Sequence, residues 1–117
     1  MRAGSGKSRL VLSWAVLLAG CAAPAPVELD LTGAVPTTDT SELARVLQAV
    51  VTDGGRFDPA ALKRMEGTLD ACLRKLAVTG PRATPELFPT YGSRWAYWYN
   101  ARAAWSMKLA LLAGCPR

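Results

Sequence analysis

Residues 93–112 read SRWAYWYNARAAWSMKLALL, and this stretch decides the fold that the sequence predicts. At 100 degrees per residue it forms a helix with two apolar sides. One is a broad stripe of large side chains: Trp95, Trp98, Tyr99, Arg102, Trp105, Leu109 and Leu112. The other carries mostly small side chains: Ala96, Asn100, Ala103, Ala104, Met107 and Leu111. Only a narrow wedge, Arg94, Ala101 and Lys108, is expected to face water.

A helix so apolar around its circumference needs partners on most sides. A membrane-spanning role fits poorly, because Asn100, Arg102 and Lys108 would lie in the hydrocarbon. The aromatic stripe is interpreted chiefly as core, although contact with sugar or lipid would use the same residues. The rest of the chain covers about one side of this helix, so we expect an apolar surface that a further protein could cover.

The helix expected before it in sequence begins after Asp39 or Thr40 and ends at Gly54-Gly55. Its apolar positions recur at three- and four-residue spacing: Leu43, Val46, Leu47 and Val50. Between it and residues 93–112 we expect one more helix.

That middle helix begins at Asp58-Pro59, where an acceptor side chain precedes a proline. Its shared apolar face comprises Leu62, Met65, Leu69, Leu73 and Leu76. Gly67 costs about 1 kcal/mol relative to alanine there, so a bend or break is expected at that residue. Gly80-Pro81 ends the helix, and Pro85 and Pro89 keep the next residues extended.

The N-terminus has the organisation of an export signal. Arg2, Lys7 and Arg9 precede an apolar run that is too short to span a bilayer as a permanent helix. Leu18-Ala19-Gly20-Cys21 then resembles the lipobox of bacterial lipoproteins. This resemblance implies cleavage between Gly20 and Cys21 and acylation of Cys21. The alternative is an ordinary signal peptide or anchor helix in which Cys21 follows Gly20 by coincidence.

Two or more acyl chains, at about 0.8 kcal/mol per buried methylene, make an anchor that does not readily dissociate. We therefore expect a lipoprotein on the extracytoplasmic face of a bacterial membrane. The outer membrane is favoured, because Ala22 lacks the aspartate that often retains such lipoproteins in the inner one. Residues 21–40, with few signs of helical periodicity, are expected to form an acylated, flexible tether.

The positive charge belongs mostly to the signal. The chain has 14 basic and 9 acidic residues. Three of the basic residues lie in residues 1–20, which leaves 11 against 9 in the 97 residues that follow. This balance gives no support to nucleic-acid binding. Half of the residues are apolar, so one small globular domain is expected in residues 41–117.

The chain contains no histidine. Serine-histidine and cysteine-histidine nucleophilic sites are therefore excluded, together with the commonest metal ligand. Lysine or carboxylate chemistry has no spacing signature here, and residues 4–8 lack the full phosphate-loop pattern. We expect neither a cofactor nor a metal, and no enzymatic activity.

With Cys21 acylated, Cys72 and Cys115 remain in a compartment that permits disulfides. A bridge would close a loop of about 44 residues and stabilise the domain by about 4 kcal/mol in the chain-entropy model. The alternative is a buried Cys72 and a free Cys115, and the sequence alone leaves both open.

Asn100 is the most suggestive polar residue. It lies among small side chains where another backbone can approach closely, and a buried amide needs hydrogen-bond partners. We expect a structural clamp on a neighbouring loop rather than a catalytic group.

Residues 96–101, Ala-Tyr-Trp-Tyr-Asn-Ala, resemble the Ala-Phe-Trp-Ile-Asn-Ala core of the domain-of-unknown-function 547 family. Residues 53–58 and 69–73 resemble two further pieces in the same order, so the likeness covers about residues 40–112. Trp98, Tyr99 and Asn100 lie in the most specific piece. The likeness implies the helical first portion of a larger α+β domain. The family's second Tyr-Asn pair is replaced by Arg102-Ala103, and its later half is absent.

The sequence thus predicts a mainly α chain of about three helices, with residues 1–20 as signal, 21–40 as tether and 41–117 as a partial domain. As function we expect a membrane-anchored helical module that binds another envelope protein through residues 93–112. The alternative is a truncated fragment of a longer envelope protein of hydrolase type, not catalytically competent alone.

Overall fold

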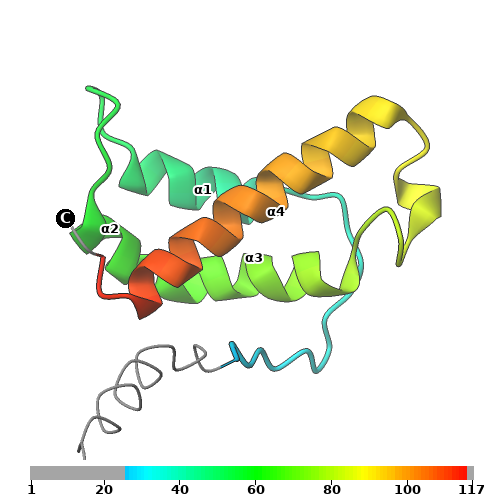
Figure 1. The fold of residues 1–117 in the computed structure, drawn as a ribbon, viewed down its shortest axis with the longest axis horizontal. Coiled ribbons are helices and arrows are strands. Elements are labelled where there is room, and N and C mark those ends of the chain that lie inside the picture. The colour runs from blue at the N-terminus through cyan, green and yellow to red at the C-terminus, as the bar shows by residue number, and fades with distance from the viewer. Residues whose placement is uncertain (1–25, 116–117) are drawn as a thin grey trace, which may run out of the picture.

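The computed structural model describes residues 26–115, and the expectations for Gly20 and Cys21 lie outside that range. The described part consists of four α-helices and one 3₁₀ turn without a strand: α1 (Ser41–Val50), α2 (Pro59–Arg64), α3 (Glu66–Val78), η1 (Pro85–Leu87) and α4 (Tyr91–Leu112). The predicted mainly helical class is therefore confirmed. Figure 1 shows α1 and α3 side by side and α4 crossing them diagonally.

Helix α1 is shorter than the sequence pattern indicates. It ends at Val50, and Val51 pairs with Phe57 in an isolated antiparallel bridge. Between them, the Gly55 amide donates to the Thr52 carbonyl at 2.8 Å, with Gly55 at φ +71°. A positive φ is inexpensive only for glycine. The glycine pair thus forms a turn, and the helix stops before it.

The predicted middle helix divides into α2 and α3. Asp58 caps α2 by accepting hydrogen bonds from the amides of Ala60 and Ala61 at 2.9 and 3.1 Å. The interruption falls at Met65, whose φ of −92° and ψ of 6° leave the helical range, and its amide is shared between the carbonyls of Ala61 and Leu62. The expected break at Gly67 is wrong by two residues, because Gly67 lies within the first turn of α3.

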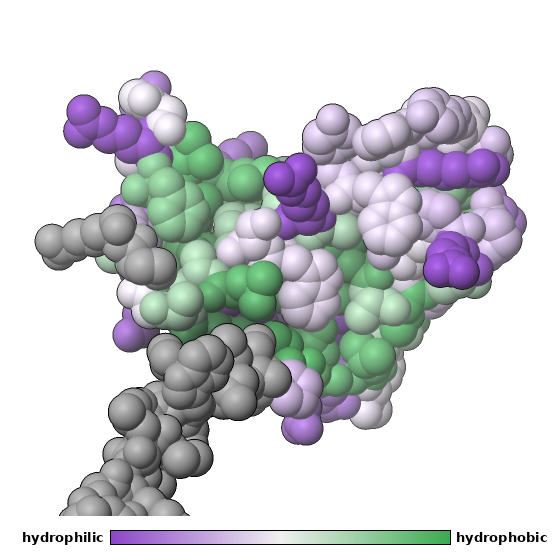
Figure 2. Space-filling view, in the orientation of Figure 1, coloured by the Kyte–Doolittle hydropathy of each residue, from purple (hydrophilic) through white to green (hydrophobic). Residues whose placement is uncertain are grey.

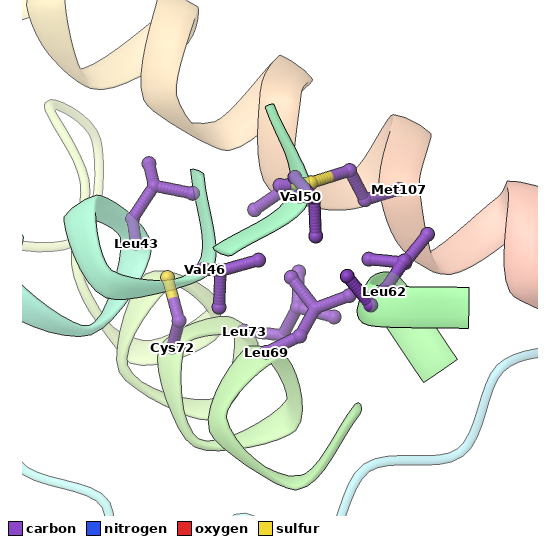
Figure 3. Close-up of a cluster of buried hydrophobic side chains, with 10 residues drawn as sticks. Leu43, Val46, Val50, Leu62, Leu69, Cys72, Leu73 and Met107 are labelled. Atoms are coloured by element: carbon purple, nitrogen blue, oxygen red, sulfur yellow. The ribbon is translucent and has the colours of Figure 1, made fainter. Parts of the chain in front are cut away.

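The core lies where the helices meet (Figure 3). Its members are all apolar and buried, and they come from every α-helix: Leu43, Val46, Val50, Ala61, Leu62, Leu69, Cys72, Leu73, Ala104 and Met107. Helix α3 contributes Leu69 and Leu73, which have no exposed surface. Contacts of α3 with α1, α2 and α4 make it the central helix of the described chain.

Helix α4 begins at Tyr91, two residues before the predicted start. Thr90 and Ser93 form a capping box, in which the Thr90 hydroxyl accepts from the Ser93 amide at 3.1 Å and the Ser93 hydroxyl accepts from the Thr90 amide at 3.2 Å. Each bond satisfies an amide that the helix leaves unpaired. The helix ends at Leu112, as predicted.

The orientation of α4 corrects the sequence analysis. Ala101 and Lys108, expected in water together with Arg94, are each only 7% exposed, and only Arg94 is exposed. The buried side of α4 comprises Ala101, Ala104, Met107 and Lys108. Small side chains allow α4 to approach the core closely, so the large aromatic side chains lie on the opposite side.

Lys108 tolerates burial because two carboxylates of α3 surround its ammonium group. Its Nζ lies 3.1 Å from Glu66 Oε1 and 2.8 Å from Asp70 Oδ1. Desolvation alone would lower the pKa of Lys108, but hydrogen bonds with Asp70 and Glu66 outweigh it, and the pKa is raised. The ion pairs join α4 to the first turns of α3.

The segment before α1 packs along α3 rather than forming a free tether. The Thr37 amide donates to Thr79 Oγ1 at 3.1 Å, and Arg74 donates to the Thr32 carbonyl at 2.9 Å. Leu29 packs against the core. The later part of the expected tether, residues 21–40, thus contacts the helices at these three residues. Within residues 26–115, no helix has the length and hydropathy needed to cross a membrane.

Candidate functional site

The most prominent surface feature is an aromatic face on α4, made of large side chains that contact solvent. They are Tyr91, Trp95, Trp98, Tyr99, Leu109 and Leu112, between 48% and 74% exposed. Trp105 of the predicted stripe is half-buried and packs against the core. The interpretation of the stripe as core is therefore wrong for most of its members.

The rings of this face pack against one another. Tyr91 and Trp95 lie with ring centroids 5.8 Å apart in an edge-to-face arrangement, and Trp95 and Tyr99 lie 6.0 Å apart. Residues four apart are neighbours on a helix surface, so the three rings form a continuous row. Such pairs restrict ring motion, so the row is partly ordered before any partner binds.

The charged side chains of α4 all have one sign. Helix α4 contains Arg94, Arg102 and Lys108 and no carboxylate. Lys108 is neutralised inside, whereas Arg94 and Arg102 are exposed. The two exposed guanidinium groups give this face a positive potential, which favours a negatively charged partner. In Figure 2, pale side chains gather over the first half of α4 at the upper right, with hydrophilic ones among them.

A second feature is a cleft of about 290 Å³ beside α4. Four segments line it: residues 37–42, 72–76, 87–88 and 93–100. Its walls include Leu76, Phe88 and Tyr97, and Asn100 and the hydroxyls of residues 37–40 contribute polar atoms. Helix α3 and the first half of α4 thus form two walls, and the chain entering α1 forms a third.

Asn100 lines this cleft, half-buried. Among the described residues its side chain makes no hydrogen bond, so the predicted clamp on a neighbouring loop is not formed within residues 26–115. The other two residues of the family-like motif, Trp98 and Tyr99, lie on the aromatic face. The three motif residues therefore lie on two different surfaces, Asn100 in the cleft and Trp98 and Tyr99 on the aromatic face.

The ionic groups of the cleft are nearly balanced. Lys75 Nζ lies 3.0 Å from Glu42 Oε1, which joins α3 to α1. Asp39 accepts hydrogen bonds from the amide and hydroxyl of Ser41, and these bonds lower the pKa of Asp39. Asp39 is therefore ionised at neutral pH, and the cations Lys75 and Arg45 lie near enough to lower its pKa further.

Cys72 lies at the base of the cleft and is 6% exposed. Burial, with the Glu42 carboxylate as a lesser cause, raises the pKa of Cys72 to about 11. The thiol is protonated at neutral pH, whereas nucleophilic attack requires the thiolate.

The alternative of a Cys72–Cys115 disulfide is not formed, because both are free cysteines. Cys72 lies beside the start of α1, whereas Cys115 lies near Pro59 and Glu66, at the other end of α3. The two cysteines thus line different pockets.

One wall of the cleft is held by Tyr97. Its hydroxyl donates to the Leu76 carbonyl at 3.0 Å, and its ring lies edge-on to Phe88 at 5.2 Å. A Cβ at Gly80 would lie 3.0 Å from the Tyr97 hydroxyl oxygen, so a larger residue there would have to displace the Tyr97 ring. This contact fixes the turn after α3 against α4.

Sequence reasoning singled out Asn100 but missed the cleft. The lining comes from segments more than 60 residues apart in sequence, and Thr37 to Thr40 belonged to a stretch interpreted as tether. The only signal was the run of hydroxyl residues before α1. Within residues 26–115, three or more acidic or cysteine side chains nowhere gather in a way that could hold a metal ion.

No family model matches this chain. No curated protein and no solved structure shows significant similarity to it.

Proposed function

We propose that this protein is a lipid-anchored helical module of the bacterial cell envelope that binds an envelope protein through the aromatic face of α4. The observation that carries the proposal is the exposure of Trp95, Trp98 and Tyr99 on one side of a single helix. Burying apolar area is the main gain in association, and tryptophan, tyrosine and arginine are the residues that dominate binding energies at protein interfaces.

The chemistry of the partner follows from the charge of α4. Arg94 and Arg102 flank the rings, and the helix has no carboxylate to balance them. The partner surface should therefore combine an apolar groove for the rings with an acidic rim. Raising the salt concentration should slow association, because rim charges act mainly on the association rate.

The anchor rests on the resemblance of residues 18–21 to a lipobox. Acylation of Cys21 would hold the folded part near the membrane surface and raise the local concentration of membrane partners. Replacing Cys21 with serine should abolish acyl labelling and block processing by the lipoprotein peptidase. A Cys21→Ser protein that is still processed and still membrane-bound would defeat this part of the proposal.

Docking is tested with the full chain, tagged and purified from envelope extracts in detergent. A partner that co-purifies with the wild type is identified, purified separately and measured for binding. Trp95→Ala and Trp98→Ala should each weaken binding at least tenfold, or about 1.4 kcal/mol or more, as expected for central interface residues. Leu47→Ala, an exposed apolar residue of α1, is the matched control and should leave binding unchanged.

Equal binding by the tryptophan variants and the wild type would exclude the aromatic face as the docking surface. Tight binding of a chain without residues 1–21 to vesicles of anionic lipid, lost in both tryptophan variants, would instead identify the face as a bilayer contact, since aromatic and basic side chains also favour that interface.

A further inference from the structure

The cleft next to Asn100 combines the properties of a small-molecule or peptide site. Binding pockets are concave and mostly apolar, with a few polar groups that fix orientation. Here the volume is about 290 Å³, and Leu76, Phe88 and Tyr97 give it apolar walls. The cleft adjoins the aromatic face but shares no residue with it, because Asn100 and Ala96 line the cleft whereas Trp95 is exposed. The two surfaces meet where the Trp98 ring lies edge-on to Tyr97, with ring centroids 4.9 Å apart.

The polar groups of the cleft differ in what they can still bind. The Ser93 hydroxyl is engaged in the capping box, where it also donates to the Thr90 carbonyl at 2.7 Å. The Asn100 amide has no hydrogen bond within residues 26–115 and lines the cleft. It therefore offers two donor hydrogens and an acceptor oxygen to a ligand.

A side-chain amide can pair with a backbone amide in both directions, accepting from its N–H and donating to its carbonyl. The apolar walls beside it suit an aliphatic side chain, which would remove apolar surface from water. Lys75, the cation in the lining of the described cleft, is already paired with Glu42, so the lining offers no unpaired cation to a carboxylate. We propose that this cleft binds an internal peptide segment that inserts one aliphatic side chain and pairs its backbone amide with Asn100.

The test uses the full chain in detergent micelles, labelled with ¹⁵N and titrated with N-acetyl-L-leucinamide. This probe has about 12 non-hydrogen atoms, and a dissociation constant of about 1 mM is expected for its size. Amide signals of Phe88, Ala96 and Asn100 should shift saturably, and those of Leu109 and Leu112 at the end of α4 should not.

Three further probes test which parts of N-acetyl-L-leucinamide the cleft recognises. N-acetylglucosamine keeps the acetamide but lacks the aliphatic side chain, and 4-methyl-2-pentanol keeps an aliphatic group but lacks the amide. N-acetyl-L-leucine, with its free carboxylate, tests the charge. Each should bind at least fivefold more weakly than N-acetyl-L-leucinamide.

Asn100→Ala and Asn100→Asp should each weaken the binding of N-acetyl-L-leucinamide at least fivefold. Since Asn100 has no partner within residues 26–115, both variants should unfold at about the wild-type temperature. Ser106→Ala, an exposed position on the same helix outside the cleft, is the control and should bind as the wild type does.

The proposal is overturned if N-acetyl-L-leucinamide causes no saturable shift, if both Asn100 variants bind it as the wild type does, or if the sugar or the alcohol binds equally well. Failure of the tryptophan variants to affect protein docking would leave this result untouched, because the two surfaces share no residue.

Discussion

Lys108 carries a charged side chain that is buried in the fold. Its ammonium group is held between Glu66 and Asp70, whose side chains are 44% and 36% exposed and so remain hydrated. Removing the ammonium leaves two carboxylates side by side on α3, one helical turn apart, with an apolar gap beneath them. The loss is moderated by the water that reaches both carboxylates.

Lys108→Ala should therefore lower the free energy of unfolding by about 1–3 kcal/mol. Chemical denaturation followed by circular dichroism measures this change. Arg102→Ala, which removes an exposed cation from the same helix, should change it by less than about 0.5 kcal/mol. Equal effects of the two variants would show that the ion pairs of Lys108 contribute nothing specific.

The buried Cys72 thiol makes the stability of the fold depend on pH in the alkaline range. Burial, and to a lesser extent Glu42, raises the pKa of the folded thiol to about 11, above its ordinary value of 9.0. The thiol's contribution is therefore fully present below pH 9 and is lost as pH rises towards 11, because the unfolded chain releases the proton first. Two pKa units correspond to about 2–3 kcal/mol.

Unfolding experiments at pH 8, 9, 10 and 11 test this prediction. The wild type should lose stability from about pH 9 onward. Cys72→Ala should be less stable at pH 8 but should show a shallower decline, with the remaining loss beginning at higher pH, where Tyr97 and Lys108, whose pKa values are both raised, titrate. Parallel curves for the two proteins would contradict the assignment to Cys72.

At the scale of elements, replacing glycine with alanine should change the free energy of unfolding in opposite directions at Gly55 and Gly67. Gly67 lies exposed in α3, where an added Cβ would meet no atom within 4 Å, whereas Gly55 holds φ +71° in the turn after α1. Gly67→Ala should raise the free energy of unfolding by about 0.5–1 kcal/mol through helix propensity.

Gly55→Ala should lower the same free energy by about 1 kcal/mol or more, because alanine is strained at that φ. Thermal unfolding of both variants next to the wild type measures the two shifts. Changes of the same sign would contradict the assignment of Gly67 to a helix and Gly55 to a turn.

The sequence predicted the existence of the helices because their apolar residues recur with helical spacing, as at Leu43, Val46 and Val50. It located the ends less well. Val51 left α1 early to pair with Phe57, and the interruption fell at Met65 instead of Gly67. These details depend on hydrogen bonds between segments, which periodicity does not contain.

The side of α4 that faces the core was predicted wrongly. A hydropathy pattern counts tryptophan and tyrosine as core residues, whereas close approach to α3 favours Ala101 and Ala104, and Lys108 is buried through its ion pairs. The cleft could not be predicted either, because it also depends on tertiary packing. Asn100 was identified, but its surroundings arise from segments that only the tertiary packing brings together.

At the scale of the whole molecule, packing divides α4 between three environments. One side joins the core, another lines the cleft, and the aromatic face contacts solvent over Trp95, Trp98 and Tyr99. Exposed aromatic rings in a row lower solubility unless something covers them. A binding partner is therefore the simplest reason for this surface.

Photo-crosslinking in living cells tests that claim most directly. A photoreactive amino acid replaces Tyr99, which is 65% exposed on the aromatic face, or Gln48, which is exposed on α1. The account predicts a discrete crosslink to one envelope protein from position 99, none from position 48, and loss of the crosslink when Trp95→Ala is added. Crosslinks of equal pattern from both positions, or none from position 99, would contradict it.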